Sequence, residues 1–333
     1  MILGCSGLTL TADERHFFGD TDPLGFILFA RNCSDPSQVT DLVNILRESV
    51  HRPDAPVLID QEGGRVARLG PPHWRKPPPA AAFARLYERD PDAGLEATRL
   101  NARLMAHELL ALGIDVDCTP VLDVPVAGAH DIIGDRAYGR VPEPIIALGR
   151  AVCDGLMAGG VAPVIKHIPG HGRARSDSHV ELPVVEATYE ELSNSDFVPF
   201  RALADMPWAM TAHVVYTAID PAAPATTSAT AIDTIIRRDI GFGGALMSDD
   251  LGMQALAGDF AGRARTSLAA GCDVVLHCSG KMDEMRGVAK GLSPMTEAAF
   301  RRVEAARIPR PDKVLDAAGA RARLEQLLAM ASA

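Results

Sequence analysis

APVIKH, residues 162–167, is a short run of apolar residues that ends on two polar side chains, and runs of this kind recur along the chain. Each is followed by a stretch in which apolar residues fall at helical spacing, which is typical of parallel βα units. Near-continuous apolar runs also suit strands that are covered on both faces. There are eight such runs: ILGCS (2–6), GFILFA (25–30), PVLID (56–60), IDVDCT (114–119), APVIKH (162–167), WAMTAH (208–213), ALMSD (245–249) and DVVLH (273–277).

Eight βα units in one chain predict a single (β/α)8 (TIM) barrel, with its reactive groups at the carboxyl ends of the strands. A doubly wound sheet is the alternative, but it is expected to carry a glycine-rich phosphate-binding turn after its first strand. The turn after residues 5–7 is not of that kind. We expect residues 1–333 to form one domain, closed by helices in the tail from about 295 to 333.

The connections between the runs support the same fold. Apolar spacing predicts a helix that begins at Pro36, behind Ser34 and Asp35, and a second helix over 93–112 that ends at Gly113. The stretch 69–83 holds five prolines and predicts a long ordered loop, and 220–230 predicts a shorter connector.

The composition excludes several classes of protein. A hydrophobic fraction of 47% with 23% charged residues allows a large core, and a net charge of −10 argues against a general nucleic-acid binder. The six cysteines form no CxxC pair, which favours reduced, buried thiols. No apolar run approaches the roughly 20 residues of a membrane helix, and the N-terminus lacks a signal-peptide pattern. We therefore expect a cytoplasmic protein with no membrane contact.

Charged side chains follow the third strand in IDQEGGRVAR, residues 59–68. Asp60 leaves the strand, and the chain then turns on two glycines and returns Arg68. A carboxylate beside a guanidinium suits the vicinal hydroxyls of a sugar, because the acid accepts and the arginine donates hydrogen bonds. The alternative is a salt bridge that stiffens the turn. Arg136, in IIGDRAYG (132–139), is either a similar ligand or a surface residue.

The loop after the fifth strand, KHIPGHGRARSDSH (166–179), carries a possible acid/base pair. Asp177 and His179 lie two residues apart, so the carboxylate could hold one ring nitrogen and leave the other free to transfer a proton. Lys166 and His167 end the strand itself. A solvated loop with structural histidines is the alternative.

A metal site is a further alternative for this loop. His167 and His171 have HxxxH spacing, and Asp249 or His213 could complete the ligand set. The HxxxH pattern works best on a helix, however, and the Pro-Gly pair at 169–170 prevents one here.

Two adjacent carboxylates end the seventh strand in GALMSDDLG, residues 244–252. Neighbouring side chains point in different directions, so we expect Asp249 to face the barrel mouth and Asp250 to brace it, as the N-cap of the next helix. An aspartate at a strand end can attack a sugar anomeric carbon if a partner acid protonates the departing oxygen.

These motifs occur together in a known family. The order is DQEGGRVAR (60–68), GDR with a following aromatic-Gly (134–139), KHIPGHG (166–172), DSH with a following Leu-Pro (177–183) and SDDLGM (248–253). In this combination the chain resembles glycoside hydrolase family 3, and within it the single-domain bacterial β-N-acetylglucosaminidases of cell-wall recycling. The matches span about residues 3 to 280.

The resemblance implies a role for each matching position. Asp249 corresponds to the nucleophile of a retaining mechanism, His179 to the acid/base and Asp177 to its partner. The implied substrate is a muropeptide in which N-acetylglucosamine is β-1,4-linked to 1,6-anhydro-N-acetylmuramic acid, with or without peptide. No metal or organic cofactor is implied, and we expect a monomer or weak dimer. The positions that match sugar-binding residues are Asp60, Arg68, Arg136, Lys166 and His167.

Other functions stay open on the sequence alone. A metal-dependent hydrolase could use the same barrel and the same histidines. A related β-glucosidase or glycoside phosphorylase would keep most of the motifs. A non-catalytic sugar-binding protein would not need the Asp249 and His179 pair.

Overall fold

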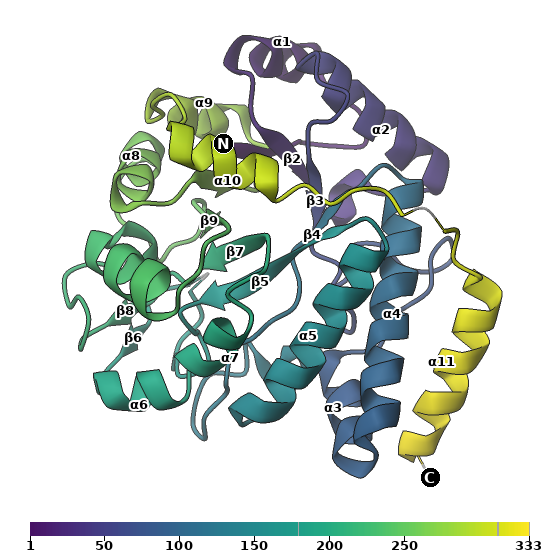
Figure 1. Cartoon of the computed structure of the whole chain (residues 1–333). Helices are drawn as coiled ribbons and strands as arrows, with labels where there is room; N and C mark the ends of the chain where they lie inside the picture. The colour runs from purple at the N-terminus through teal and green to yellow at the C-terminus, as the bar shows by residue number, and fades with distance from the viewer. Residues whose placement is uncertain (179, 312, 333) are drawn as a thin grey trace.

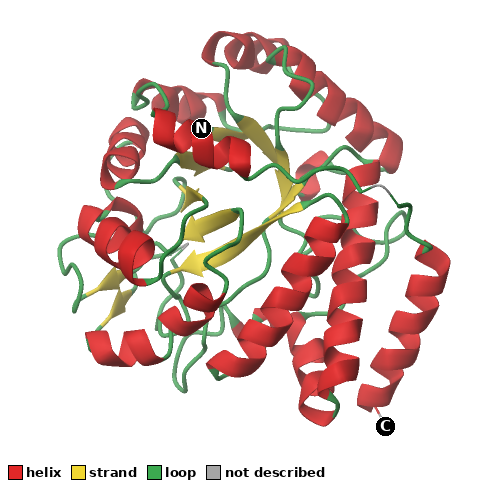
Figure 2. Cartoon of the chain, in the orientation of Figure 1, coloured by secondary structure: helices red, strands yellow, loops and turns green. Residues whose placement is uncertain are grey.

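A computed structural model describes residues 1–178, 180–311 and 313–332 of the chain. Its centre is a closed barrel of parallel strands, surrounded by helices (Figure 2). Neighbouring strands follow the order β1-β10-β9-β7-β5-β4-β3-β2 around the barrel. The eight runs found in the sequence are these strands, so the predicted (β/α)8 barrel is confirmed. Their bounds are β1 (Ile2–Gly4), β2 (Gly25–Leu28), β3 (Val57–Ile59), β4 (Val116–Asp117), β5 (Ala162–Ile168), β7 (Trp208–Thr211), β9 (Ala245–Asp250) and β10 (Val274–His277).

Helices cover the outside of the barrel (Figure 1). The two helices predicted from apolar spacing are present as α2 and α4, each behind an aspartate N-cap whose side chain accepts a backbone N–H. A π-helical segment covers Ala231–Asp239. The remaining bounds are α1 (Ala12–Thr21), α2 (Pro36–Ser49), α3 (Ala80–Arg89), α4 (Pro91–Ala111), α5 (Pro142–Ala158), α6 (Tyr189–Asn194), α7 (Phe197–Ala202), α8 (Phe260–Ala270), α9 (Met282–Lys290), α10 (Glu297–Ala305) and α11 (Ala317–Ser332).

The proline-rich loop is shorter than predicted. We expected it to reach residue 83, but α3 begins at Ala80. The three consecutive alanines after Pro79 are strong helix formers, and the last proline lies outside the helix, where it does no harm.

The two closing helices of the C-terminal tail are present and lie on different parts of the molecule (Figure 1). At the end of α10, Val303 and Ala306 pack with Val116, Ala162 and Trp208, which lie at the amino end of the barrel interior. Helix α11 packs on α3 and α4. Helix α10 therefore lies at the amino end of the barrel, opposite the carboxyl ends of the strands.

A second, small sheet was not predicted. β6 (Val184–Val185) and β8 (Val215–Tyr216) pair in parallel, and they belong to the segments that follow β5 and β7. Runs of two residues carry too little periodicity to be found in a sequence. Within the described parts of the chain, no helix combines the length and the apolar character that a bilayer crossing requires.

Candidate active site

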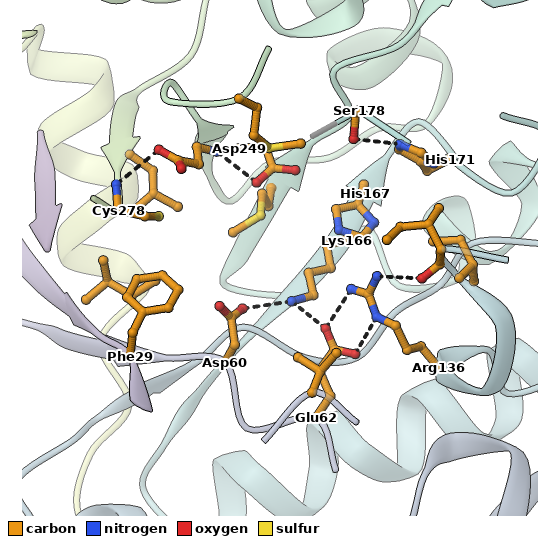
Figure 3. Close-up of a pocket in the computed structure, with 18 of the residues that line it drawn as sticks. Phe29, Asp60, Glu62, Arg136, Lys166, His167, His171, Ser178, Asp249 and Cys278 are labelled. Carbon is orange, nitrogen blue, oxygen red and sulfur yellow. Dashed lines mark hydrogen bonds and ion pairs between the residues drawn. The ribbon is translucent and has the colours of Figure 1, made fainter. Parts of the chain in front are cut away.

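A pocket of about 330 Å³ opens at the carboxyl end of the barrel (Figure 3). Its wall collects side chains from the ends of β2, β3, β5, β7, β9 and β10, from the loops that follow several of them and from the loop after β4. Six residues named from the sequence line it together: Asp60, Arg68, Arg136, Lys166, His167 and Asp249. They come from segments far apart in the chain, so the barrel topology alone brings them to one place.

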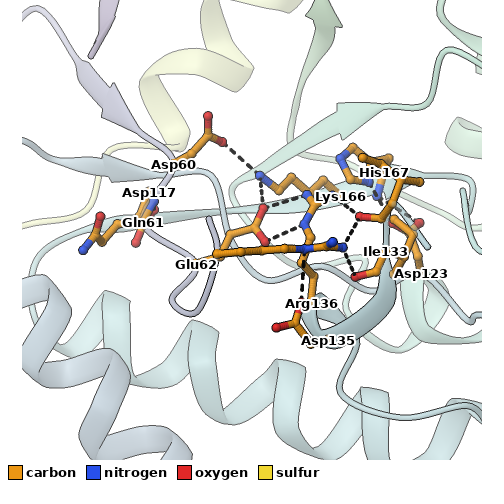
Figure 4. Close-up of polar contacts among 12 residues, drawn as sticks. Asp60, Gln61, Glu62, Asp117, Asp123, Ile133, Asp135, Arg136, Lys166 and His167 are labelled. Atoms are coloured by element: carbon orange, nitrogen blue, oxygen red, sulfur yellow. Dashed lines mark hydrogen bonds and ion pairs between the residues drawn. The ribbon is translucent and has the colours of Figure 1, made fainter. Parts of the chain in front are cut away.

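Lys166 is the centre of the charged wall (Figure 4). Its buried ammonium donates to Asp60 Oδ1 at 3.0 Å and contacts Glu62 Oε1 at 2.7 Å. Arg68 Nη2 donates to the other oxygen of Asp60 at 3.0 Å. Burial on its own would raise the pKa of Asp60, but Lys166 and Arg68 hold it well below its usual range. Asp60 is therefore a fixed anion that can accept hydrogen bonds from a ligand.

Glu62 is a site residue that the sequence analysis did not single out. It binds Arg136 through two parallel hydrogen bonds, Nε to Oε2 and Nη2 to Oε1, both 2.8 Å long. Burial opposes its ionisation, yet Lys166 and Arg136 lower the pKa of Glu62 to about 2. The signal was present in the motif DQEGG, where a second carboxylate follows the strand two residues after Asp60.

This wall joins two carboxylates to three cations. The cations carry more N–H donors than the two carboxylates can accept. The salt bridge between Asp60 and Arg68, which the sequence left as an alternative, is present. It is part of a larger network in the pocket. Arg136 is not a surface residue, because its side chain is 11% exposed and its guanidinium is held by Glu62. Such a network can exchange some of its contacts for the hydroxyl groups of a sugar.

His167 is fixed by a carboxylate that the sequence did not assign to the site. Asp123 is fully buried, and its Oδ2 lies 2.7 Å from Nδ1 of His167. Its other oxygen accepts the backbone N–H of His171 at 2.6 Å and that of His167 at 3.2 Å. Asp123 thus orients the His167 ring and anchors the turn behind it. The partners of a buried carboxylate depend on the tertiary fold, and the sequence near residue 123 does not indicate them.

Asp249 is the penultimate residue of β9, and it lines the pocket opposite the Lys166 network (Figure 3). Its Oδ1 accepts the backbone N–H of Asp250 at 2.8 Å. Burial would raise the pKa of Asp249, but the imidazoles of His213 and His167 and the N–H of Asp250 keep it below its ordinary value. The side chain is therefore an anion at neutral pH, as a carboxylate nucleophile must be.

Asp250 braces the site, but not in the way we expected. Its Oδ1 accepts the N–H groups of Gly252 at 2.9 Å and Cys278 at 3.0 Å, which ties β9 to the segment after β10. The expectation that it caps the next helix is wrong. Helix α8 begins at Phe260, and its N-cap is Asp259, whose side chain accepts the N–H of Gly262.

The predicted acid/base pair is only partly within the described structure. Asp177 is described, and its carbonyl accepts the N–H groups of Val180 and Glu181. Ser178, the next residue, lines the pocket. His179 lies outside the described residues. The pairing of Asp177 with His179 therefore stays a prediction.

The histidines named for a metal site have other partners in the structure. His213 contacts Thr226 Oγ1 at 2.7 Å and the carbonyl of Asp250 at 3.0 Å. Of the residues that the structure describes, no three or more His, Cys, Asp or Glu side chains form a group that could hold a metal ion.

A (β/α)8 barrel with a strand-end carboxylate facing buried charges that could exchange hydrogen bonds with hydroxyl groups fits the class of barrel glycoside hydrolases. Comparison with known proteins agrees. Residues 10–308 match the model described as glycosyl hydrolase family 3 N terminal domain. The chain belongs to glycoside hydrolase family 3, as the motifs indicated.

Named relatives are similar over most of their length. A beta-hexosaminidase from Alkalilimnicola ehrlichii is 42% identical over 286 residues, 84% of this chain and 80% of the relative. One from Methylococcus capsulatus is 43% identical over 82% of this chain and 80% of its own. The crystal structure of native NagZ from Neisseria gonorrhoeae superposes with a TM-score of 0.89 at 33% identity, covering 98% of this chain and 97% of that one. The chain is accordingly a glycoside hydrolase similar to beta-hexosaminidases.

Proposed function

We propose that this protein is a retaining exo-β-N-acetylglucosaminidase of cell-wall recycling. Its substrate would be a cytoplasmic muropeptide, cut at the β-1,4 bond between N-acetylglucosamine and 1,6-anhydro-N-acetylmuramic acid. The observation that carries the proposal is the ionised Asp249 across one small pocket from the Asp60, Lys166 and Arg68 network. A volume near the lower end of the ~300–1,000 Å³ usual for small-molecule sites suits one terminal sugar.

The proposed chemistry has two steps. The Asp249 carboxylate attacks the anomeric carbon while His179 gives a proton to the departing glycosidic oxygen, so a covalent glycosyl-enzyme forms as the old bond breaks. His179 then takes a proton from a water molecule, which attacks the same carbon and releases Asp249 as a carboxylate. Two inversions give net retention. An imidazole with an unperturbed pKa of about 6.5 suits both transfers near neutrality, and Asp177 would orient it.

The remaining roles concern binding. We assign the terminal N-acetylglucosamine to Asp60, Arg68, Arg136, Lys166 and His167, with the acid accepting from hydroxyl groups and the cations donating to them. The complex of the Neisseria gonorrhoeae relative with N-trifluoroacetyl-D-glucosamine supports a glucosamine-type ligand. We further propose that residues 1–333 act as one catalytic domain, in a monomer or weak dimer, with no metal or organic cofactor.

A chromogenic N-acetylglucosaminide tests the proposal. Wild-type protein should release the chromophore, and Asp249→Ala should reduce kcat by at least about 10³-fold because the covalent step is lost. Asp283→Ala is the matched control, since this carboxylate lies fully exposed on α9. Equal rates for wild type and Asp249→Ala would end the enzymatic claim.

Two additions to the same assay separate the alternatives. Activity that survives EDTA supports metal-free hydrolysis, whereas loss of activity that a divalent metal restores favours a metal-dependent hydrolase. A rate that needs inorganic phosphate, with a sugar phosphate as product, indicates a phosphorylase. A preference for the glucoside over the N-acetylglucosaminide indicates a β-glucosidase.

A further inference from the structure

The loop that follows β5 has a rigid base. Tyr216 donates its hydroxyl to the carbonyl of Gly170 at 2.7 Å, and Arg173 donates to the buried Asp196 at 2.6 Å. Gly172 lies so close to Val124 that a Cβ there would stand 2.1 Å from the Val124 carbonyl oxygen. These contacts fix residues 170–173 against neighbouring parts of the barrel mouth.

The tip of the same loop is held at Ser178. Its hydroxyl lies 3.2 Å from Nε2 of His171, and its carbonyl accepts the N–H of Ala255, on the segment after β9, at 3.2 Å. Both His171 and Ser178 are buried, at 3% and 4% exposure, and both line the pocket (Figure 3). The first contact ties the tip of the loop to its own rigid base, and the second ties it to the segment that follows the strand carrying Asp249.

His171 is suited to hold a hydroxyl group without carrying charge. Burial, helped by the neighbouring His167 ring at a centroid distance of 5.6 Å, lowers the pKa of His171 to about 4. The ring is therefore neutral near pH 7, with one nitrogen protonated and the other a lone-pair acceptor. The Asp123 carboxylate accepts the backbone N–H of His171, so the backbone that carries the ring is held in place.

We propose that the hydrogen bond between His171 and Ser178 is a latch that positions the acid/base segment, with both side chains acting as positioning residues. Ser178 stands between Asp177 and His179 in the chain, so its hydroxyl sets where that segment stands relative to Asp249. This inference rests on the proposed function, because it gives those two residues their catalytic roles. A displacement of about 1 Å at a proton-transfer group can cost on the order of 10²-fold in rate.

The structure offers a clean way to break the latch. Ser178→Ala removes the side-chain contact to His171 but keeps the backbone contact to Ala255, so the loop retains its second attachment. Ser178→Thr keeps a hydroxyl at the same position. His171→Phe keeps a flat ring beside His167 and removes both nitrogens.

Two aryl N-acetylglucosaminides reveal whether proton donation is affected. The value of kcat/KM covers the steps up to aglycone departure, and a 3,4-dinitrophenolate leaves without a proton whereas a phenolate needs one. We expect Ser178→Ala to lower kcat/KM for the phenyl substrate by about tenfold or more and for the dinitrophenyl substrate by less than about twofold. Ser178→Thr should restore most of the phenyl rate.

Controls separate positioning from a general loss of structure. His171→Phe should show the same substrate-selective loss, and the double variant should be no slower than the worse single variant, because both act through one contact. Ser37→Ala, an exposed serine on α2, should change neither rate. Thermal unfolding of each variant checks that it folds. If Ser178→Ala does not fold, His171→Phe serves as the test variant in its place.

Three results would overturn the latch. They are equal losses on both substrates, no loss on either, and failure of threonine to restore the phenyl rate. Each requires an active wild type, so each leaves the proposed function standing. A wild type that cleaves neither substrate overturns the proposed function, and the latch with it.

Discussion

At Lys166 the barrel buries an ammonium group between two carboxylates, an arrangement that is costly unless every charge has a partner. Glu62 supplies two of those partnerships, one to Lys166 and a bidentate one to Arg136. Glu62 is the more buried of the two carboxylates, with its side chain 6% exposed against 14% for Asp60, and it holds both Lys166 and Arg136. Removing the charge of Glu62 should therefore destabilise the whole charged wall of the pocket.

Glu62→Gln should lower the free energy of unfolding by about 3 kcal/mol, because Arg136 stays buried without its counter-charge and Lys166 keeps only Asp60. Denaturant unfolding at neutral pH measures the change. Glu297→Gln, on a largely exposed carboxylate paired with Arg301, is the control and should stay within about 0.5 kcal/mol of wild type. A Glu62 variant as stable as that control would show that the network does not depend on this charge.

His171 should make the protein sensitive to mild acid. Its folded pKa of about 4 lies below the ordinary 6.5, so between these values the unfolded chain binds a proton that the folded protein refuses. The free energy of unfolding contributed by this group is complete above pH 6.5 and falls as the pH drops toward 4. From neutral pH to about pH 4.5 wild type should lose about 2 kcal/mol more than His171→Phe, which has no titrating ring.

Unfolding curves of the two proteins at both pH values make this comparison. Equal losses would show that the His171 ring titrates normally in the folded protein. The Lys166 network should not mask the effect, because both proteins contain it and its contribution cancels in the comparison.

Among the elements, the loop after β5 depends on a close approach at its base. Gly172→Ala would place a methyl group against the Val124 carbonyl and force the loop outward. We expect a stability loss of about 1–3 kcal/mol together with a fall in kcat on an N-acetylglucosaminide. Gly243→Ala is the matched control, because a Cβ there meets nothing within 4 Å. Wild-type stability and activity in Gly172→Ala would mean that the loop base is not tightly set.

The elements also show what the sequence could predict. Strands of the barrel were found because an apolar run covered on both faces has a local signature. The end of the 69–83 loop was missed because the propensity of three alanines outweighed the prolines before them. The roles of Glu62 and Asp123 were missed because their partners, Arg136 and His167, lie 74 and 44 residues away in sequence. Such pairings depend on the closed barrel, so a motif such as DQEGG shows the second carboxylate but not its partner.

Over the whole molecule, the C-terminal helix α11 lies beyond the family match, which ends at residue 308, yet it packs on α3 and α4. Leu327 of α11 is 1% exposed and belongs to the main core cluster between barrel and helices. If residues 1–333 are one domain, Leu327→Ala should lower the free energy of unfolding by about 2–5 kcal/mol and leave kcat/KM unchanged.

Denaturant unfolding followed by far-UV circular dichroism and by activity tests this prediction. One shared transition that moves as a unit in the variant supports a single cooperative domain. A separate early transition for α11, with the barrel midpoint unmoved, would show that the helix is an appendage. Met330→Ala on the same helix, where the side chain is 48% exposed, should change little.

In the proposed mechanism Asp249 becomes covalently attached to the sugar, and this intermediate can be trapped. Incubation with 5-fluoro-N-acetylglucosaminyl fluoride, followed by proteolysis and tandem mass spectrometry, locates the attached sugar. We expect one label, on Asp249, and none in Asp249→Ala. A label on Asp250, or steady turnover of the wild type with no label at Asp249, would contradict the proposed mechanism.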